Sequence, residues 1–435
     1  MRILLVSPWA RRHRRYKSPL NFLIAYPPLT LPTLAALVPP ELEAEICVFD
    51  EISDRRLPAG RFDVVAITAM TTEAARAYEL ADLYRGQGSF VVLGGYHASF
   101  MPEEAAGHAD AVVTGLADAA WPRLLRELAA GGWPAGIHDG GAELSGLAEG
   151  CPVPDRSVLK GRPYSPINTV IANHGCPNRC SFCAISRIAD YRQRPIESVI
   201  DELRGLGRRN LIFYDPNFFA DRAYALELMK AMEPLRLRWG ATATVDFGFD
   251  DELLDAAQRA GLSGVLIGFE SMSRQALESA NKRFAEPGSY RQAVLNIHRR
   301  RITINGSFVL GLDEDSAEDL AILPDRILEM GIDLPLFFLL TPIPGSGLFE
   351  ELKQQGRILT EDWSRYTQAD VVFSPLGMTA GQLQDSYSLA WRRSYSFRNI
   401  LRRVFNTPGT SAYHKFIVLC MNVGFKFLGR DRAVA

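Results

Sequence analysis

HGCPNRCSFC, residues 174–183, places three of the chain's six cysteines in one short stretch. Cys176, Cys180 and Cys183 follow the spacing C-x₃-C-x₂-C. Three thiolates at this spacing can bind three irons of a 4Fe–4S cluster and leave the fourth iron without a protein ligand. Two other interpretations fit the same residues: a structural zinc site with His174 as its fourth ligand, and a chance group of buried thiols.

The region after this stretch favours a large domain over a small zinc module. Short runs rich in β-branched residues recur at helix-length intervals, at residues 169–172, 210–214, 241–245, 264–269, 303–309 and 334–340. Amphipathic helical patterns lie between these runs, most clearly at 251–259 and 317–330. Six strand–helix units predict a partial, open (β/α)₆ barrel of the TIM type, with its chemistry at the carboxyl ends of the strands.

The first 130 residues alternate in the same way. Strand-like runs with few charges fall at 3–6, 46–49, 64–68, 90–93 and 111–114. Such runs are typical of parallel strands that are covered on both faces. We therefore predict a doubly wound, Rossmann-like α/β domain at 1–130, whose ligand binds at the carboxyl ends of its strands.

The remaining parts of the chain have weaker patterns. Residues 131–165 are rich in Gly, Pro and Ala without a sustained period, which predicts a linker before a barrel at 166–355. Residues 356–435 predict a mainly helical extension that covers the substrate. Within it, KFIVLCMNVGFKFL (415–428) is too short to span a bilayer but can lie on its surface, and a helix docked on the core is the alternative.

The cysteine stretch and its surroundings resemble the radical S-adenosylmethionine (SAM) enzymes that carry a cobalamin-binding domain before the barrel. The resemblance includes the aromatic Phe182 just before the last cysteine, which implies that Phe182 contacts the cofactor. It also implies a catalytic 4Fe–4S cluster bound by Cys176, Cys180 and Cys183, with SAM chelating the fourth iron. Reductive cleavage of that SAM would yield a 5′-deoxyadenosyl radical.

Motifs at strand ends extend the resemblance through the barrel. FYDPNFF contains Asp215 and Asn217, and GFES contains Glu270 and Ser271. In the family these regions meet SAM, which implies that the four side chains bind it. Glu270 and Ser271 suit the paired ribose hydroxyls as acceptor and donor. Each motif alone also fits an ordinary turn or a solvated strand end.

Two further motifs complete the barrel pattern. NGSFVLGLDED includes the fifth strand, where the family packs backbone and small residues against adenine, so the resemblance implies contacts by Gly306 and Gly311. TPIPGSGLFEEL (341–352) is similar to the family's segment after the sixth strand, and NK at 281–282 follows GFES at the family's position.

In the first domain the resemblance rests on PPLTLPTLAAL, VFDE, AITAMTTEA and LGGYHASFMPEE. The last two segments follow strands and imply that Thr68, Thr71, Gly94, Gly95 and His97 contact cobalamin. The two glycines would let a bulky ligand approach the backbone closely. An ordinary polar loop histidine is the alternative for His97.

Two departures separate this domain from many cobalamin-binding domains. Those carry D-x-H-x-x-G, whose histidine ligates cobalt, whereas here Asp50 is followed by Ile52 in the histidine's place and Arg55 in the glycine's. TGLAD replaces the usual acidic Gly-rich turn after the last strand. We therefore expect cobalamin without a histidine lower ligand, and a sheet that has lost its ligand is the alternative.

Composition limits partners and compartment. A net charge of −2 argues against nucleic-acid binding. An oxygen-sensitive cluster, an N-terminal apolar run too short for a signal peptide, and the lack of a membrane-length apolar run predict a cytoplasmic protein. Cys47, Cys151 and Cys420 are scattered, which disfavours the second cluster of methylthiolating radical enzymes.

Together these observations predict a cobalamin-dependent radical SAM enzyme. We expect a methyltransferase that acts on an unactivated carbon of a small-molecule or lipid-like metabolite. Two SAM molecules would serve, one as methyl donor to cobalamin and one as radical source, with a ferredoxin or flavodoxin as electron donor. One alternative keeps the architecture but catalyses oxidative cyclisation, hydroxylation or rearrangement. The other is a non-catalytic cobalamin or Fe–S sensor.

Overall fold

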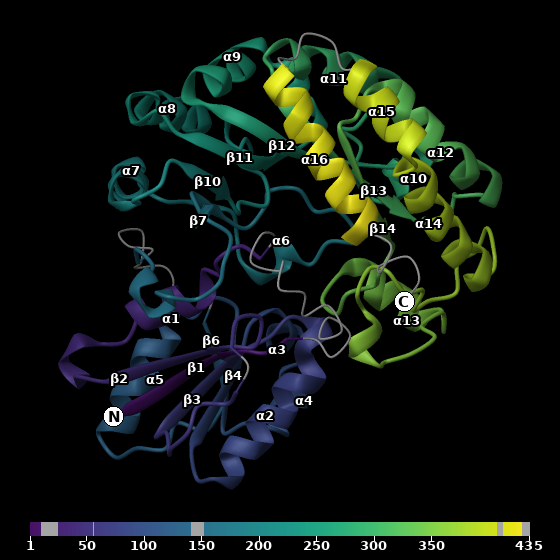
Figure 1. Cartoon of the computed structure of the whole chain (residues 1–435). Helices are drawn as coiled ribbons and strands as arrows, with labels where there is room; N and C mark the ends of the chain where they lie inside the picture. The colour runs from purple at the N-terminus through teal and green to yellow at the C-terminus, as the bar shows by residue number, and fades with distance from the viewer. Residues whose placement is uncertain (10–24, 55, 141–151, 407–411, 429–435) are drawn as a thin grey trace. The chain divides into compact units, whose positions relative to one another are not determined.

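The computed structural model describes residues 1–9, 25–54, 56–140, 152–406 and 412–428 (Figure 1). It divides into two compact units. The first comprises Met1–Val170, Ala184–Arg208 and Asp362–Arg365, and the second comprises Ile171–Cys183, Arg209–Glu361 and Tyr366–Ala435. Arg55 and the whole segment 141–151 within the expected linker, including Cys151, lie outside the described residues.

The first unit is built on a parallel sheet with the strand order β2-β1-β3-β4-β5-β6. Its strands are β1 (Arg2–Ser7), β2 (Glu45–Asp50), β3 (Val64–Thr68), β4 (Phe90–Gly94), β5 (Ala111–Thr114) and β6 (Gly136–Asp139). The first five confirm the expected strands. β6 lies inside the segment that we expected to be a linker. The sequence does not predict this strand because its residues GIHD form an exposed edge strand without an apolar run.

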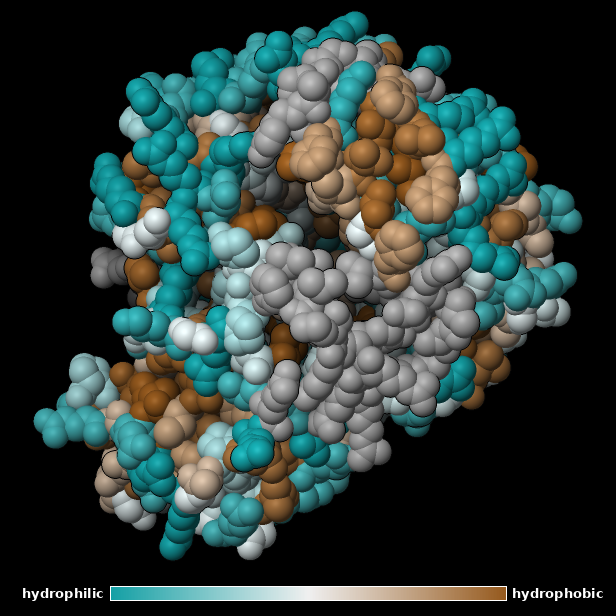
Figure 2. All heavy atoms as spheres, in the orientation of Figure 1, coloured by the Kyte–Doolittle hydropathy of each residue, from teal (hydrophilic) through white to brown (hydrophobic). Residues whose placement is uncertain are grey.

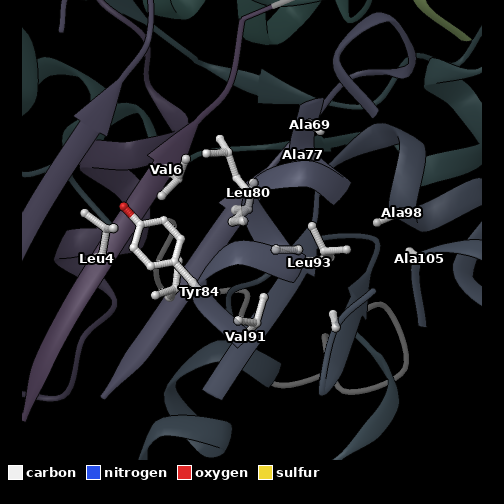
Figure 3. Packing of buried hydrophobic residues seen from close by; sticks show 14 of the residues in the cluster. Leu4, Val6, Ala69, Ala77, Leu80, Tyr84, Val91, Leu93, Ala98 and Ala105 are labelled. Atoms are coloured by element: carbon white, nitrogen blue, oxygen red, sulfur yellow. The ribbon is translucent and has the colours of Figure 1, made fainter. Parts of the chain in front are cut away.

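Helices cover both faces of this sheet. Leu4 and Val6 of β1 point to one face, which packs against α2 (Ala74–Gly86), α3 (Tyr96–Phe100) and α4 (Pro102–Ala106), and Figure 3 shows this packing. Ile3 and Leu5 point to the other face, which packs against α1 (Thr30–Ala36) and α5 (Ala120–Ala129). Alternate side chains of the strand thus belong to two hydrophobic cores, one on each face of the sheet. This confirms the doubly wound architecture.

Segments from later in the chain complete the first unit. Tyr164 donates a hydrogen bond to the buried carboxylate of Asp50, and Arg162 donates to the carbonyl of Val48 at 2.6 Å. These contacts fix the residues before the cysteine stretch against the sheet. Trp363 also belongs to this unit, and its indole Nε1 donates to Glu104 at 3.0 Å.

The second unit contains the five parallel strands β10 (Asn210–Phe213), β11 (Arg238–Ala243), β12 (Leu262–Glu270), β13 (Thr303–Leu310) and β14 (Leu334–Leu339). Each coincides with an expected strand. The shorter elements before and after the cysteine stretch in the sequence are β7 (Asn168–Val170), β8 (Asn173–His174), α6 (Ile185–Ile188), β9 (Arg192–Gln193) and α7 (Ile196–Gly205). Of these, only β8 belongs to the second unit.

The helices of the second unit are α8 (Arg222–Met232), α9 (Asp251–Ala260), α10 (Arg274–Ser279), α11 (Tyr290–Arg299), α12 (Ala317–Met330), α13 (Gly347–Gln354), α14 (Ala380–Ser394), α15 (Phe397–Asn406) and α16 (Ala412–Leu428). A side-chain oxygen caps the start of six of them and satisfies a backbone N–H that has no partner within the helix. The capping residues are Asp221, Asp250, Ser273, Ser316, Ser346 and Thr379.

The two faces of the second sheet differ in burial. On the outer face, Phe269, Phe308, Phe337 and Trp391 contact one another in sequence, with ring centroids 5.6–6.2 Å apart, and all are buried. On the inner face, alternate residues of β12, β13 and β14 are only half-buried. A closed TIM barrel fills its interior with side chains. The open sheet here leaves room for ligands instead.

Candidate active site

The cysteine stretch is fixed by the segment that follows α10. The Asn281 side chain donates to the carbonyl of Arg179 at 2.7 Å, and Ser181 N–H donates to the carbonyl of Ala280 at 3.1 Å. Asn281 adopts a left-handed backbone conformation with φ of 54°, which asparagine tolerates better than most residues. On the other side, Leu348 N–H donates to the carbonyl of Ser181 at 2.9 Å. The loop is therefore preorganised by three backbone-directed hydrogen bonds.

The three thiols of this loop lie near one another. Cys176 and Cys183 are close enough to Cys180 to act on its charge, as are Lys282 and Glu270. Burial raises the pKa of Cys176 and raises the pKa of Cys180 to about 11, and the Lys282 ammonium opposes the rise at both. Iron must therefore supply the stabilisation that turns these buried thiols into thiolates.

This donor set fits a cluster better than a single ion. Among the described residues, no three His, Cys, Asp or Glu side chains converge closely enough to hold one metal ion. A 4Fe–4S cluster instead needs three thiolates that ligate three separate irons. None of the described cysteines forms a disulfide. Three cysteines close together in one loop are the donor set that such a cluster needs.

A buried ion pair lies beside the thiols at the carboxyl end of β12. Lys282 Nζ is 2.8 Å from both Glu270 Oε1 and the carbonyl of Gly268, and Ser307 Oγ is 3.4 Å from Glu270 Oε2. Glu270 adopts a left-handed conformation with φ of 61°, at the point where the register between β12 and β13 shifts. A Cβ on Gly268 would lie 2.2 Å from Glu270 Oε1, so a side chain at this position would displace the Glu270 carboxylate.

The local strain at Glu270 therefore aims its carboxylate along the inner face of the sheet, next to Ser307 and Lys282. Sequence reasoning assigned Glu270 but gave no role to Lys282, although NK at 281–282 was recognised as part of the pattern. Glu270 and Lys282 are twelve residues apart, and neither helical nor strand periodicity predicts a contact at that separation.

Asp215 and Asn217 are buried and hold the start of the cysteine stretch. Asp215 accepts from Ala172 N–H at 2.8 Å and from the Asn173 side chain at 3.1 Å. The Asn173 side chain also donates to the carbonyl of Asn217 at 3.3 Å. Both residues thus position the loop, and direct contact with SAM stays a prediction for each.

A cavity of about 240 Å³ opens at the carboxyl ends of β12 and β13. Glu270 and Ser271 line it, as predicted site residues, together with Asp315. Asp315 accepts from the N–H groups of Gly311 and Leu312 at 2.8 and 3.0 Å, and burial raises its pKa to about 6. The cavity therefore contains the salt-bridged carboxylate of Glu270 and the Asp315 carboxyl group, whose pKa is raised.

Of the two glycines predicted to contact adenine, Gly306 lies in β13 and Gly311 follows it directly. A Cβ on Gly306 would meet Ile332 at 2.9 Å and Phe269 at 3.3 Å, which places Gly306 on the outer face of the sheet. Gly311 has φ of 101°, and its Cβ would lie 2.6 Å from Leu383. Both glycines are thus required by packing within the protein. A contact of either with adenine stays a prediction.

At the carboxyl edge of the first sheet, Thr68 and Gly94 are paired in register at the ends of β3 and β4. Gly95 follows with φ of 91°, and a Cβ there would lie 2.7 Å from Thr68 Oγ1 and 2.8 Å from the carbonyl of Ala69. Its own chain therefore requires this glycine. Met70, next in the loop after β3, is 57% exposed, so the edge offers apolar surface to a ligand.

His97 and Thr71 lie behind this edge. His97 is 1% exposed, its Nδ1 is 3.4 Å from Thr71 Oγ1, and its Nε2 is 3.5 Å from Glu104. Its ring packs edge-on against Trp363 with centroids 5.3 Å apart, and burial lowers the pKa of His97. These contacts favour a structural role for His97, and its contact with cobalamin stays a prediction.

The chain matches the Radical SAM superfamily model over residues 170–323 and the B12 binding domain model over residues 43–125. It is 31% identical over 378 residues to the bacteriochlorophyllide d C-12(1)-methyltransferase of Chlorobaculum tepidum, which covers 84% of this chain and 82% of the relative. The bacteriochlorophyllide d C-8(2)-methyltransferase of the same organism is 27% identical over 417 residues, covering 92% and 91%.

A solved structure shares the whole fold. TsrM from Kitasatospora setae, a radical SAM methyltransferase solved with cobalamin and a 4Fe–4S cluster, has a TM-score of 0.68 at 16% identity and covers 97% of this chain and 99% of its own. The B12 binding domain model covers the edge residues of the first sheet, and the Radical SAM model covers the three cysteines. With 31% identity across more than four-fifths of a relative, the protein belongs to the cobalamin-dependent radical SAM enzymes.

Proposed function

We propose that this enzyme is a C-methyltransferase that acts on an unactivated carbon of a hydrophobic acceptor and consumes two SAM molecules. The observation that carries the proposal is the preorganised loop of Cys176, Cys180 and Cys183 beside the Glu270–Lys282 pair. The identity to relatives named as methyltransferases supports it over other radical outcomes.

When bound, the cluster, SAM and cobalamin supply a carbon-centred radical and a methyl group. The three cysteines would hold the cluster. Glu270 would accept hydrogen bonds from hydroxyl groups of a bound nucleoside, while the contact with Lys282 orients its carboxylate. Ser271 and Asp315 line the adjoining cavity and would orient or exclude water there.

Residues of the first sheet would hold cobalamin. Thr68 and Gly94 end adjacent strands, and Met70 presents its thioether side chain at the same edge. No nitrogen ligand for cobalt is proposed: Ile52 stands where many such domains have histidine, and the nearby His97 is buried against Thr71 and Trp363. The proposal is therefore cobalamin without a histidine lower ligand.

The acceptor is proposed to be a hydrophobic small molecule, such as a tetrapyrrole or a lipid. The names of the two relatives support the first, because both act on bacteriochlorophyllide d. Leu336 and Phe338 of β14 and Val309 of β13 leave apolar, half-buried side chains on the inner face of the sheet. Such a surface suits an apolar acceptor better than a charged one.

The proposal also includes partners and a compartment. A ferredoxin or flavodoxin would deliver electrons to the loop, whose three cysteines are only half-buried. A cytoplasmic location suits an oxygen-sensitive cluster. Peripheral contact with a membrane through α15 and α16 is part of the proposal. Among the described residues, no helix is long and apolar enough to cross a bilayer.

The test needs no acceptor. The protein is reconstituted anaerobically with iron, sulfide and cobalamin, and is then given reductant and methyl-deuterated SAM. We expect S-adenosylhomocysteine, 5′-deoxyadenosine and deuterated methylcobalamin, quantified by mass spectrometry. Deoxyadenosine without labelled methylcobalamin would contradict methyl transfer and favour cyclisation or another radical outcome. Zinc in place of iron, with neither nucleoside product, would overturn the enzyme itself.

A further inference from the structure

Helices α15 and α16 carry apolar side chains on the surface of the second unit (Figure 2). On α15, Phe397, Leu401 and Phe405 recur every four residues and are 60%, 49% and 69% exposed, so they form one stripe along the helix. Exposed side chains of α16 extend it. We name the following residues the apolar ridge: Phe397, Leu401, Phe405, Phe416, Ile417, Met421 and Phe427.

The two helices pack against each other through neighbouring side chains that are buried. Ile400 of α15 meets Val418 of α16, and both are buried. Arg403 donates to the side chain of Asn422, whose amide donates to the carbonyl of Asp333 at 3.0 Å. The inner faces thus already attach the helices to the second unit. Contiguous exposed apolar side chains on a protein surface mark a site of interaction.

The charge around the apolar ridge has one sign. Residues 386–430 contain eight Lys and Arg residues and neither Asp nor Glu. Arg398 and Arg402 lie one position after Phe397 and Leu401, so they form a basic stripe beside the apolar one. Lys426 Nζ lies 4.3 Å from the centre of the Phe397 ring. A second copy of this surface would bring like charges together, whereas an anionic surface would complement them.

A cavity of about 750 Å³ adjoins the apolar ridge on α15. It is also lined by residues of α11, α12 and α14, and five arginines surround it: Arg291, Arg393, Arg398, Arg402 and Arg403. Only Asp325 and Glu329 oppose them among its lining residues, and Asp325 is paired with Arg393. We name this space the arginine cavity. Guanidinium groups bind phosphate by paired hydrogen bonds, so its chemistry suits a phosphate monoester or diester.

We propose that α15 and α16 dock the enzyme on an anionic bilayer, with the apolar ridge among the acyl chains and a phospholipid headgroup phosphate in the arginine cavity. Interfacial helices combine apolar burial with electrostatic attraction in this way. The inference rests on the proposed function and deepens it, because a hydrophobic acceptor partitions into the same bilayer. The occupant is an anionic phospholipid, and free phosphate and a second copy are outcomes of the test.

The experiment is vesicle co-sedimentation of the full, reconstituted chain. Vesicles of phosphatidylcholine with about 30% phosphatidylglycerol should bind the protein at least about tenfold more strongly than phosphatidylcholine alone. Arg398→Glu/Arg402→Glu should remove that preference, and Leu401→Ser/Phe405→Ser should weaken binding to both vesicles about tenfold or more. Arg204→Glu, on α7, and Leu376→Ser change side chains that are 64% and 68% exposed and should bind as the parent does.

Four results would overturn the proposal. The parent fails to sediment with anionic vesicles, or both ridge and arginine variants sediment as the parent does. Glycerol 3-phosphate binds with the same Arg398 and Arg402 dependence while vesicles do not, which would make the cavity a site for a soluble anion. A dimer in light scattering that Leu401→Ser/Phe405→Ser dissociates, without vesicle binding, would make the ridge an interface between copies.

The same samples separate this inference from the proposed function. Each variant is assayed in solution for S-adenosylhomocysteine, 5′-deoxyadenosine and labelled methylcobalamin, none of which requires a bilayer. Normal products without vesicle binding would overturn the docking surface alone. Vesicle binding without these products would leave the docking surface standing and overturn the proposed function.

Discussion

The predicted cofactor-binding sites at the carboxyl edges of the two sheets differ in whether side chains or backbone form them. At the edge of the second sheet, side chains make the site: Lys282 is salt-bridged to Glu270, and Asn281 holds the cysteine stretch. At the edge of the first sheet, the backbone makes it: Gly95 fits against Ala69 with φ of 91°, and Thr68 pairs with Gly94.

This difference matches the chemistry expected at each edge. A cluster and a sulfonium carry charge, and placing charge in a half-buried site requires opposite charges and directed hydrogen bonds. Cobalamin is large, and a strand edge with small residues lets it lie close to the backbone. Substitutions should therefore have large effects through charge at the second edge and smaller effects through shape at the first.

The largest effect is expected at the thiols. Cys176→Ala, Cys180→Ala or Cys183→Ala removes one iron ligand and should reduce iron and sulfide content and 5′-deoxyadenosine formation to background. Cys420→Ala, which changes an exposed cysteine of α16, should keep both. Deoxyadenosine formation that survives any one of the three loop substitutions would refute the cluster assignment.

The next effect concerns the buried pair. Lys282→Met leaves the Glu270 carboxylate buried without its cation, which should lower the free energy of unfolding by about 3–5 kcal/mol. Glu270→Gln/Lys282→Met removes both charges and should recover much of this loss. Denaturant melts of the two variants and the parent make the comparison. Equal destabilisation in the single and double variants would show that the pair has no coupling.

A smaller effect depends on pH. The pKa of Asp315 is raised to about 6 in the folded protein, above its ordinary value, so the protonated acid favours the fold. Its contribution is full below about pH 4 and is lost as pH rises through 6, which amounts to about 3 kcal/mol. Asp315→Asn should therefore gain stability relative to the parent between pH 4 and 7. Parallel stability curves would contradict the buried acid.

The smallest effect tests the first edge. Gly95→Ala forces a side chain into a left-handed position against Ala69 and should cost about 1–3 kcal/mol and lower the cobalamin bound at saturation. For fold stability alone, Gly94→Ala is its matched control, because a Cβ there lies 3.5 Å from the nearest atom, the carbonyl oxygen of Val113. Absorbance of the bound corrinoid and thermal melts measure both. Equal behaviour of the two variants would remove the backbone argument.

Most elements of both sheets could be predicted from the sequence, because buried parallel strands leave continuous β-branched runs such as 64–68 and 303–309. β6 could not, since GIHD is a short, exposed edge strand without such a run. The cysteine spacing, with the strand–helix region after it, also predicts the cluster loop, whose ligands stay a prediction. The confirmed strands depend on local pattern alone.

The roles of individual site residues depend on distant partners, which local pattern does not contain. Asp215 was predicted to contact SAM, which stays a prediction, and its carboxylate also accepts from Ala172 and Asn173, more than forty residues earlier in the chain. Gly95 was predicted to contact cobalamin, which stays a prediction, and its conformation also fits closely against Thr68 and Ala69. Composition and spacing predict which residue types are present, and only the fold decides which neighbour each one meets.

Trp363 has a consequence for synthesis on the ribosome. Most of the first unit is Met1–Val170, but the Trp363 indole that contacts His97 and Glu104 is translated almost two hundred residues after Val170. At ordinary elongation rates that delay is roughly 10–40 s. During that time the nascent cobalamin-binding unit lacks the contact between Trp363 and His97. The contact forms only after most of the barrel has been translated. Loading of cobalamin is accordingly expected after translation passes Arg365, as a late step of maturation.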